Sequence, residues 1–159
     1  MASLKIPSAT YRLQTNPAFR FPDVHAIVSY LDELGISDIY LSPIFQARAG
    51  SLHGYDMVDP NRINPELGSA EEFESLVEEL RRYRMGWLQD IVPNHMAYDS
   101  ANHMLMDVLE SGEGSIFFDY FDIDWVNSPS INVCADRKPD WSWCVAARAA
   151  AGARSIWAR

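Results

Sequence analysis

The sequence lacks several features on which whole classes of function depend. It has only two cysteines, Cys134 and Cys144, which form no Cys-x-x-Cys pair. A disulfide framework or zinc site is therefore not expected, and free thiols are the better prediction. No apolar run reaches the length of a membrane span, and the first residues lack the apolar core of a signal peptide. We therefore predict a cytoplasmic protein with no membrane partner.

Basic side chains are also scarce. The 159 residues carry 13 Lys and Arg against 22 Asp and Glu, which gives a net charge of −9. Such a surface repels phosphate, so nucleic acid is not expected as a partner, whereas an uncharged ligand such as a sugar is compatible with it. The sequence has neither a Gly-x-Gly-x-x-Gly run after a strand nor a Gly-Lys-Ser/Thr loop. Nucleotide binding therefore loses its main support.

What the sequence has is enough apolar material for a core, with 48% hydrophobic residues. Charge and composition change near Trp125. Residues 1–125 carry 20 acidic and 8 basic side chains (net −12), whereas residues 126–159 carry 2 and 5 (net +3) and end in a run rich in alanine. The tail is either a linker or partly ordered extension, or the product of a change of reading frame, which we favour. We predict a division into residues 1–125 and 126–159.

Strand and helix patterns alternate within residues 1–125. Strands are predicted over residues 8–14, 36–42 and 87–92, the last a nearly continuous apolar run that is typical of a strand buried on both faces. One helix begins at Pro22 and stops at Gly35, and a second begins at a capping box of Ser69 and Glu72 and ends at Gly86. The apolar stripes of the two helices are Val24, Ile27, Val28, Leu31 and Leu34, and then Phe73, Leu76, Val77 and Leu80.

This order of elements predicts an α/β fold. A (β/α)8 barrel is the stronger prediction within that class, and it needs eight units and about 250 residues. The chain holds about three such units, so we expect the N-terminal, incomplete portion of a barrel. Its strand edges and apolar faces would be uncovered, which predicts low stability.

Two polar runs lie just beyond predicted strands. Residues 53–56 read His-Gly-Tyr-Asp within a long loop, residues 43–68, and residues 90–95 read Asp-Ile-Val-Pro-Asn-His. Parallel sheets and barrels build their active sites at the carboxyl ends of strands, and such long loops are usually functional. We therefore expect one ligand site. Its candidate residues are His53, Tyr55, Asp56, Asp90, Asn94 and His95.

Structural explanations compete with the functional ones. Asp90 is explained by burial alone as an acid that organises loops, since an unpaired buried carboxylate is costly. Packing of its loop onto the barrel rim explains Tyr55 nearly as well as a contact with sugar, and Asp56 fits an N-cap or loop anchor. A metal site of His53, His95 and Asp90 has no short His-x-x-x-His spacing behind it. Neither a metal nor a cofactor is predicted.

Retaining sugar chemistry requires two carboxyl groups about 5 Å apart. We find no candidate pair in residues 1–125. Asp119, Asp122 and Asp124 lie in an acidic, aromatic stretch that is typical of a loop or lid. No catalytic residue is therefore assigned.

The two polar runs resemble signature regions of the α-amylase superfamily of glycoside hydrolases. Residues 90–95 resemble its first signature region, and residues 53–56 resemble the loop after its second strand. The likeness is closer to the maltooligosyl trehalose synthases within that superfamily and covers about residues 6–125. The segments that carry it are residues 9–14 (ATYRLQ), 40–43 (YLSP), 50–56, 90–97 and 105–109.

This resemblance implies a (β/α)8 barrel that acts on α-1,4 glucans. Such enzymes convert the reducing-end α-1,4 linkage of a maltodextrin to α,α-1,1 through a covalent glucosyl-enzyme intermediate. By motif position, Tyr55 would stack on the sugar at the cleavage point, and His95 would hydrogen-bond to the same sugar. Asp90 and Asn94 would shape the surrounding loops. Asp56 would support the site.

The resemblance also implies that the nucleophilic Asp, the acid/base Glu and a third acid lie on later strands, and no region of this chain resembles those. We therefore expect a segment that is inactive alone. Its ligand would be a maltooligosaccharide or α-glucan, and a complementary C-terminal fragment is a candidate partner. The alternatives are a segment of another α-glucan hydrolase or glucanotransferase, or a non-catalytic maltodextrin-binding module.

Overall fold

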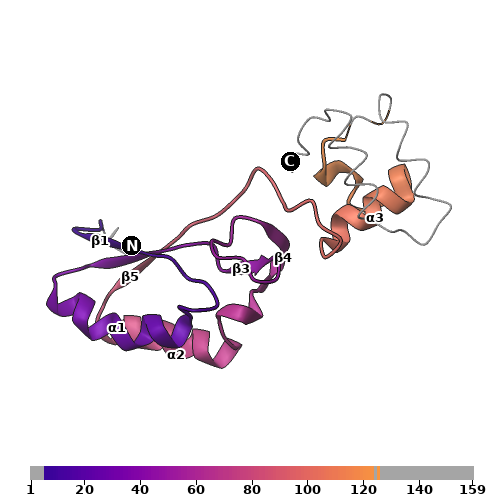
Figure 1. Cartoon of the computed structure of the whole chain (residues 1–159). Coiled ribbons are helices and arrows are strands. Elements are labelled where there is room, and N and C mark those ends of the chain that lie inside the picture. The colour runs from indigo at the N-terminus through magenta and orange to yellow at the C-terminus, as the bar shows by residue number, and fades with distance from the viewer. Residues whose placement is uncertain (1–5, 124, 126–159) are drawn as a thin grey trace. The chain divides into compact units, whose positions relative to one another are not determined.

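The computed structural model describes residues 6–123 and 125, and the chain divides into two compact units, residues 1–92 and 93–159. The first unit holds a sheet and two long helices, and the second is built around helix α3 (Figure 1). The predicted boundary at residue 125 falls where the described residues end and stays a prediction. Cys134 and Cys144 lie outside the described residues.

A parallel three-stranded sheet forms the centre of the first unit. Its strands are β1 (Thr10–Leu13), β2 (Asp38–Leu41) and β5 (Gly86–Gln89), in the order β1-β2-β5. Hydrogen bonds continue the ladder beyond the strands, because the Ser42 amide donates to Leu13 (3.0 Å) and the Asp90 amide donates to Leu41 (2.9 Å). Ser42 and Asp90 are thereby held at the edge where all three strands have their carboxyl ends.

Helix α1 (Phe21–Glu33) lies on the same side of this sheet as the second long helix (Figure 1). Val24, Val28 and Leu31 are buried against the strands, as their helical spacing predicts. Gly35 follows the helix with a φ of +86°. This left-handed conformation favours glycine and prevents the helix from continuing. The prediction that Leu34 belongs to the buried stripe is wrong. The helix ends one residue earlier, at Glu33, and the Leu34 side chain is 54% exposed.

Helix α2 (Ala70–Arg82) begins at the predicted capping box. The Glu72 amide donates to Ser69 Oγ (3.2 Å), and the Ser69 amide donates to Glu72 Oε2 (2.8 Å). The predicted stop at Gly86 is wrong, since the helix ends at Arg82 and Gly86 opens β5. Arg84 makes the turn between them with a left-handed φ of 54°.

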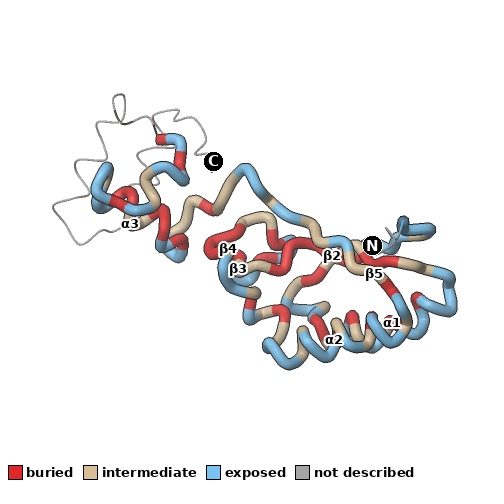
Figure 2. The backbone as a smooth tube through the Cα atoms, turned by 180° about the vertical axis from the view of Figure 1, so that it is seen from behind, coloured by how far each residue is buried: buried red, intermediate tan, exposed pale blue. Residues whose placement is uncertain are grey.

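Aromatic rings join α2 to its neighbours. Phe73 lies edge-on to Phe21 of α1 and to Trp87 of β5, with ring centroids 5.4 Å apart in both pairs. Figure 2 shows buried and exposed residues alternating along α1 and α2. The first core therefore lies between the two helices and one face of the sheet.

Strand β5 differs from the prediction of a strand over residues 87–92 that is buried on both faces. It covers Gly86–Gln89, with Leu88 40% exposed and Ile91 59% exposed. Trp87 and Gln89 face α2, so Leu88 points to the opposite side. That side has no covering helix among the described residues of the first unit, which explains why the apolar run is only partly buried.

The predicted long loop over residues 43–68 contains ordered elements. Strands β3 (Phe45–Ala47) and β4 (Met57–Ile63) pair antiparallel, and 3-10 helix η1 (Pro65–Leu67) follows. Two register irregularities interrupt the pairing, so no clean alternation marks these strands in the sequence. Residues 48–56 form the loop between them and carry the His-Gly-Tyr-Asp run.

The second unit has its own core. Helix α3 (His103–Ser111) begins at the buried Asn102, whose Oδ1 accepts from the Leu105 amide (3.1 Å). Phe121 and Ile123 pack with the helix, so part of the stretch predicted as a loop or lid is a buried element of this unit. Among its described residues, two short 3-10 helices follow, η2 (Gly112–Gly114) and η3 (Phe118–Tyr120). None of the helices in the described part of the chain combines the length and the apolar character that a membrane span requires.

Candidate functional site

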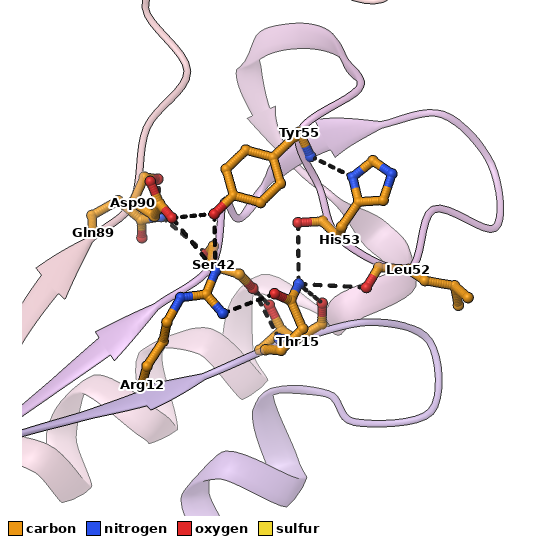
Figure 3. Close-up of polar contacts among 9 residues, drawn as sticks. Arg12, Thr15, Ser42, Leu52, His53, Tyr55, Gln89 and Asp90 are labelled. Atoms are coloured by element: carbon orange, nitrogen blue, oxygen red, sulfur yellow. Dashed lines mark hydrogen bonds and ion pairs between the residues drawn. The ribbon is translucent and has the colours of Figure 1, made fainter.

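Three side chains from three separate segments meet at the carboxyl edge of the sheet: Arg12, Tyr55 and Asp90 (Figure 3). Arg12 Nη2 donates to the Tyr55 hydroxyl (2.9 Å) and lies 3.6 Å from Asp90 Oδ2. The Tyr55 hydroxyl in turn donates to Asp90 Oδ2. These contacts form a closed triangle, which we call the Arg12 cluster.

Strand β1 and its extension hold Arg12 in place. Its guanidinium lies over the Tyr40 ring, 5.5 Å from the centroid, because the two residues are paired in register on β1 and β2. Its Nη1 donates to Gln14 Oε1 (3.0 Å). Gln14 Nε2 then donates to the backbone oxygen of His53 (3.1 Å). The end of β1 is thus tied both to β2 and to the loop that carries Tyr55.

Buried hydroxyl groups lie next to the site at the carboxyl ends of β1 and β2 and support its backbone. Thr15 and Ser42 are 2% and 0% exposed, and the Thr15 amide donates to Ser42 Oγ (2.9 Å). Gln89 Nε2 donates to the backbone oxygens of Ser42 (3.2 Å) and Asp90 (2.7 Å). This network joins the ends of the three strands and fixes the backbone from which Asp90 projects.

The loop over residues 48–56 is shaped by its own side chains. Ser51 Oγ accepts from the Gly54 amide (3.1 Å) and donates to the Asp56 carboxylate. His53 Nδ1 accepts from the Tyr55 amide (3.0 Å), and the His53 and Tyr55 rings stack with centroids 5.9 Å apart. A Cβ at Gly54 would lie 2.6 Å from the Pro43 oxygen. Only glycine lets the loop approach β2 this closely.

The contacts of the Arg12 cluster set its charges. The pKa of Asp90 is lowered, chiefly because the Tyr55 hydroxyl donates to its carboxylate, and Arg12 adds to this effect. The same hydrogen bond raises the pKa of Tyr55, and Arg12 opposes that rise. Asp90 is therefore an ionised, charge-compensated acceptor at neutral pH. It is unsuited to act as a general acid.

The structure brings four of the six candidate residues together. Tyr55 and Asp90 share a hydrogen bond, His53 stacks on Tyr55, and Asp56 anchors the loop through Ser51, with its Oδ1 3.8 Å from His53 Nδ1. The loop-anchor explanation of Asp56 agrees with this geometry. Any contact of these residues with a ligand stays a prediction.

Asn94 and His95 belong to the second unit. The Asn94 Oδ1 and His95 Nδ1 atoms lie 3.0 Å apart, so the two side chains interact with each other. Their expected part in the ligand site stays a prediction. Within the described residues, no group of three or more His, Cys, Asp or Glu side chains is arranged to hold a metal ion.

Sequence reasoning missed Arg12, Gln14 and Ser42 as site residues. Arg12 and Gln14 lie at the carboxyl end of β1, and Ser42 follows β2, so all three lie at the edge from which Asp90 was selected. Had the same positional rule been applied to every strand, it would have found Gln14 and Ser42, which follow β1 and β2, whereas Arg12 lies within β1 and has no such signal.

An open apolar groove of about 400 Å³ lies on the first unit, and Gln89, which also supports Asp90, is one of its lining residues. Phe73, Val77 and Leu80 of α2 line one side, and Trp87 of β5 lines the other. Of the described residues that line it, Arg81 is the only charged one. The groove therefore lacks the acidic groups that sugar chemistry requires.

The family model described as alpha amylase, catalytic domain, matches residues 24–142. The chain belongs to the α-amylase family. It is 41% identical over 124 residues to a protein of Mycobacterium tuberculosis named as a maltooligosyl trehalose synthase. It is 38% identical over 104 residues to the intracellular maltogenic amylase of Bacillus subtilis. These matches cover 74% and 64% of the chain.

The solved structure of the maltooligosyltrehalose synthase from Arthrobacter ramosus matches with a TM-score of 0.71 and 44% identity over 75% of the chain. The chain spans only 16% of that structure, and 16% and 17% of the two curated relatives. The predicted fold, the N-terminal part of a (β/α)8 barrel of α/β class, is confirmed by this membership.

Proposed function

We propose that this chain is the N-terminal barrel segment of a synthase-type α-amylase-family enzyme, and that it holds a maltooligosaccharide on Tyr55. The observation that carries the proposal is the Arg12 cluster, which anchors the Tyr55 hydroxyl at the carboxyl edge of the sheet. This edge is where barrel enzymes bind their substrates. The half-exposed ring offers a sugar an apolar surface for stacking.

The proposed reaction of the whole enzyme converts the reducing-end α-1,4 linkage of a maltodextrin to α,α-1,1, which is an isomerisation. Similarity to the synthases, at 41% and 44% identity, supports it over hydrolysis. Retaining transfer needs a nucleophilic and an acid/base carboxyl group about 5 Å apart. We propose that both are supplied from outside residues 6–125, so the chain alone binds glucan without rearranging it.

The four candidate residues of the first unit divide into two roles in this proposal. Tyr55 stacks on the sugar. Asp90, His53 and Asp56 keep the Tyr55 loop in place. A complementary C-terminal fragment is the proposed partner, and the cytoplasm is the proposed location.

Binding of maltopentaose to the 159-residue chain, measured by isothermal titration calorimetry, tests the binding role. Tyr55→Ala should weaken binding at least tenfold, because it removes the stacking surface. Tyr30→Ala is the matched control, since Tyr30 is 60% exposed on α1 and should leave binding unchanged. Equal affinity of Tyr55→Ala and the wild-type chain would contradict the proposed role.

A chimera tests the reaction. Residues 6–125 would replace the matching segment of the Mycobacterium tuberculosis relative, and the products from maltopentaose would be analysed. Loss of reducing ends without hydrolysis supports the synthase. New reducing ends would favour the hydrolase alternative, and a changed distribution of glucan lengths the glucanotransferase. A folded chimera that binds glucan and makes no product would support the alternative of a non-catalytic binding module.

A further inference from the structure

We propose that Arg12 is a positioning residue, which orients the Tyr55 ring for the glucan by holding its hydroxyl from one side while Asp90 holds it from the other. This inference rests on the proposed function. Arg12 acts through Tyr55 and needs no contact with the sugar. The resulting division of labour is that the hydroxyl anchors the ring and the ring face binds the ligand.

Two hydrogen bonds commit the Tyr55 hydroxyl to the protein. It donates its one proton to Asp90 and accepts from Arg12 Nη2 at 2.9 Å. A tyrosine hydroxyl has one proton to give, so it has none left to donate to a sugar. These hydrogen bonds involve the hydroxyl and not the ring itself. The His53 ring stacks against the Tyr55 ring with an interplanar angle of 28°. The contact available to a glucan is therefore the ring surface.

One hydrogen bond to Asp90 would fix the position of the hydroxyl but leave the ring free to pivot. The bond from Arg12 supplies the second direction, and its own direction is fixed by the contacts of the guanidinium plane. Nη1 binds Gln14 Oε1 at 3.0 Å, and the plane lies over Tyr40. Gln14 also donates to the backbone oxygen of His53 in the loop. The Tyr55 ring and its loop are therefore both held by the end of β1.

Lysine cannot reproduce this arrangement. Arg12 uses two different nitrogen atoms of one rigid plane, Nη1 toward Gln14 and Nη2 toward Tyr55 and Asp90. A lysine ammonium is a single point charge on a flexible stem. Arg12→Lys therefore retains a cation beside Asp90, which is only 16% exposed, but loses the fork that fixes direction.

The experiment is a double-mutant cycle on the full 159-residue chain with maltopentaose as the ligand, read by calorimetry. Arg12→Gln should weaken binding about fivefold, and Arg12→Lys about threefold. In the Tyr55→Phe background, which keeps the ring and removes the hydroxyl, Arg12→Gln should add less than a twofold loss. Arg62→Gln, an exposed arginine of β4, is the matched control and should bind as the wild type does.

An NMR titration of tyrosine Cζ gives a readout that a general loss of stability would not produce. The Tyr55 resonance is assigned by its disappearance in Tyr55→Phe. In Arg12→Gln its titration should move to higher pH, because Arg12 lowers the pKa of Tyr55. In Asp90→Asn it should move to lower pH. Circular dichroism checks that each variant folds, and Arg12→Lys carries the test if Arg12→Gln does not.

The outcomes separate the two proposals. Failure of the wild-type chain to bind maltopentaose overturns the proposed function and this inference with it. Wild-type binding that is lost in Tyr55→Ala but unchanged in Arg12→Gln overturns the positioning role alone. Additive losses in the double variant, or a Tyr55 titration that ignores Arg12, also overturn it.

Discussion

The hydroxyl group of Tyr55 donates a hydrogen bond to the carboxylate of Asp90, thirty-five positions further along the chain. The first residue lies in the loop between β3 and β4, and the second lies directly after β5. The close approach of Gly54 to Pro43 brings the loop down to the strand ends, and the β2 ladder holds Asp90 there. The backbone geometry at these two points therefore brings the polar runs at residues 53–56 and 90–95 into contact.

The loss of folding stability at acid pH should depend on Asp90. Its folded pKa is lowered below the ordinary value of 3.8, so its contribution is present above that value and is lost as the pH falls through the folded pKa. Asp90→Asn should therefore reduce the free energy of unfolding more at pH 7 than at pH 3, as measured by urea denaturation. Tyr55→Phe should weaken the same pH dependence. Equal losses at both pH values would contradict the role of the hydrogen bond.

Gly54→Ala should destabilise the chain by about 2–4 kcal/mol, because it combines a left-handed φ of +77° with a Cβ that overlaps the Pro43 oxygen at 2.6 Å. Gly50→Ala is the control in the same loop. Its φ of +73° is similar, but nothing lies within 4 Å of the added Cβ, so about 1 kcal/mol is expected. Chemical denaturation measures both. Equal costs would show that backbone strain, not the contact with Pro43, governs this position.

Two leucines of one helical stripe should behave differently. Leu31 is 1% exposed, and Leu31→Ala should cost about 2–5 kcal/mol of unfolding free energy through the cavity it leaves. Leu34 follows the end of α1 with 54% of its surface exposed, so Leu34→Ala should cost less than about 0.5 kcal/mol. Thermal and urea unfolding distinguish them. A large cost at Leu34 would mean that the apolar stripe continues past Glu33.

The capping box of α2 should contribute measurably. Ser69→Ala removes the acceptor of the Glu72 amide and should cost about 1 kcal/mol. Ser75→Ala, at an exposed position inside the same helix, should be neutral or slightly stabilising, because alanine is the better helix former. The difference between the two variants isolates the cap. It should be visible as a difference in urea midpoint.

The elements that the sequence predicted are those with strong local signals. The spacing of Val24, Val28 and Leu31 and the Ser69–Glu72 box depend on neighbours within one turn of helix, so tertiary contacts do not alter them. The β3–β4 pair was missed because β3 has only three residues and the pairing is irregular in register. The burial of β5 was overestimated because a hydrophobic run reports what a strand can bury, not what covers it.

For the site, position relative to the strand ends was informative and chemical type was not. Tyr55 and Asp90 were selected because each follows an expected strand or lies in a long loop. Arg12 was not selected, since an arginine within a short strand resembles any exposed cation until its partners are known. Its role depends on contacts with residues 43 and 78 positions away, which no local pattern encodes.

The order of the strands has a consequence for synthesis of the protein on the ribosome. Every member of the Arg12 cluster lies between residues 12 and 90, and the sheet that supports it needs only β1, β2 and β5. Because synthesis runs from the N-terminus, all the residues that form the Arg12 cluster are available once residue 90 has left the tunnel. Under the proposed function, the later parts of the barrel would then be added to a surface that already carries the Tyr55 ring.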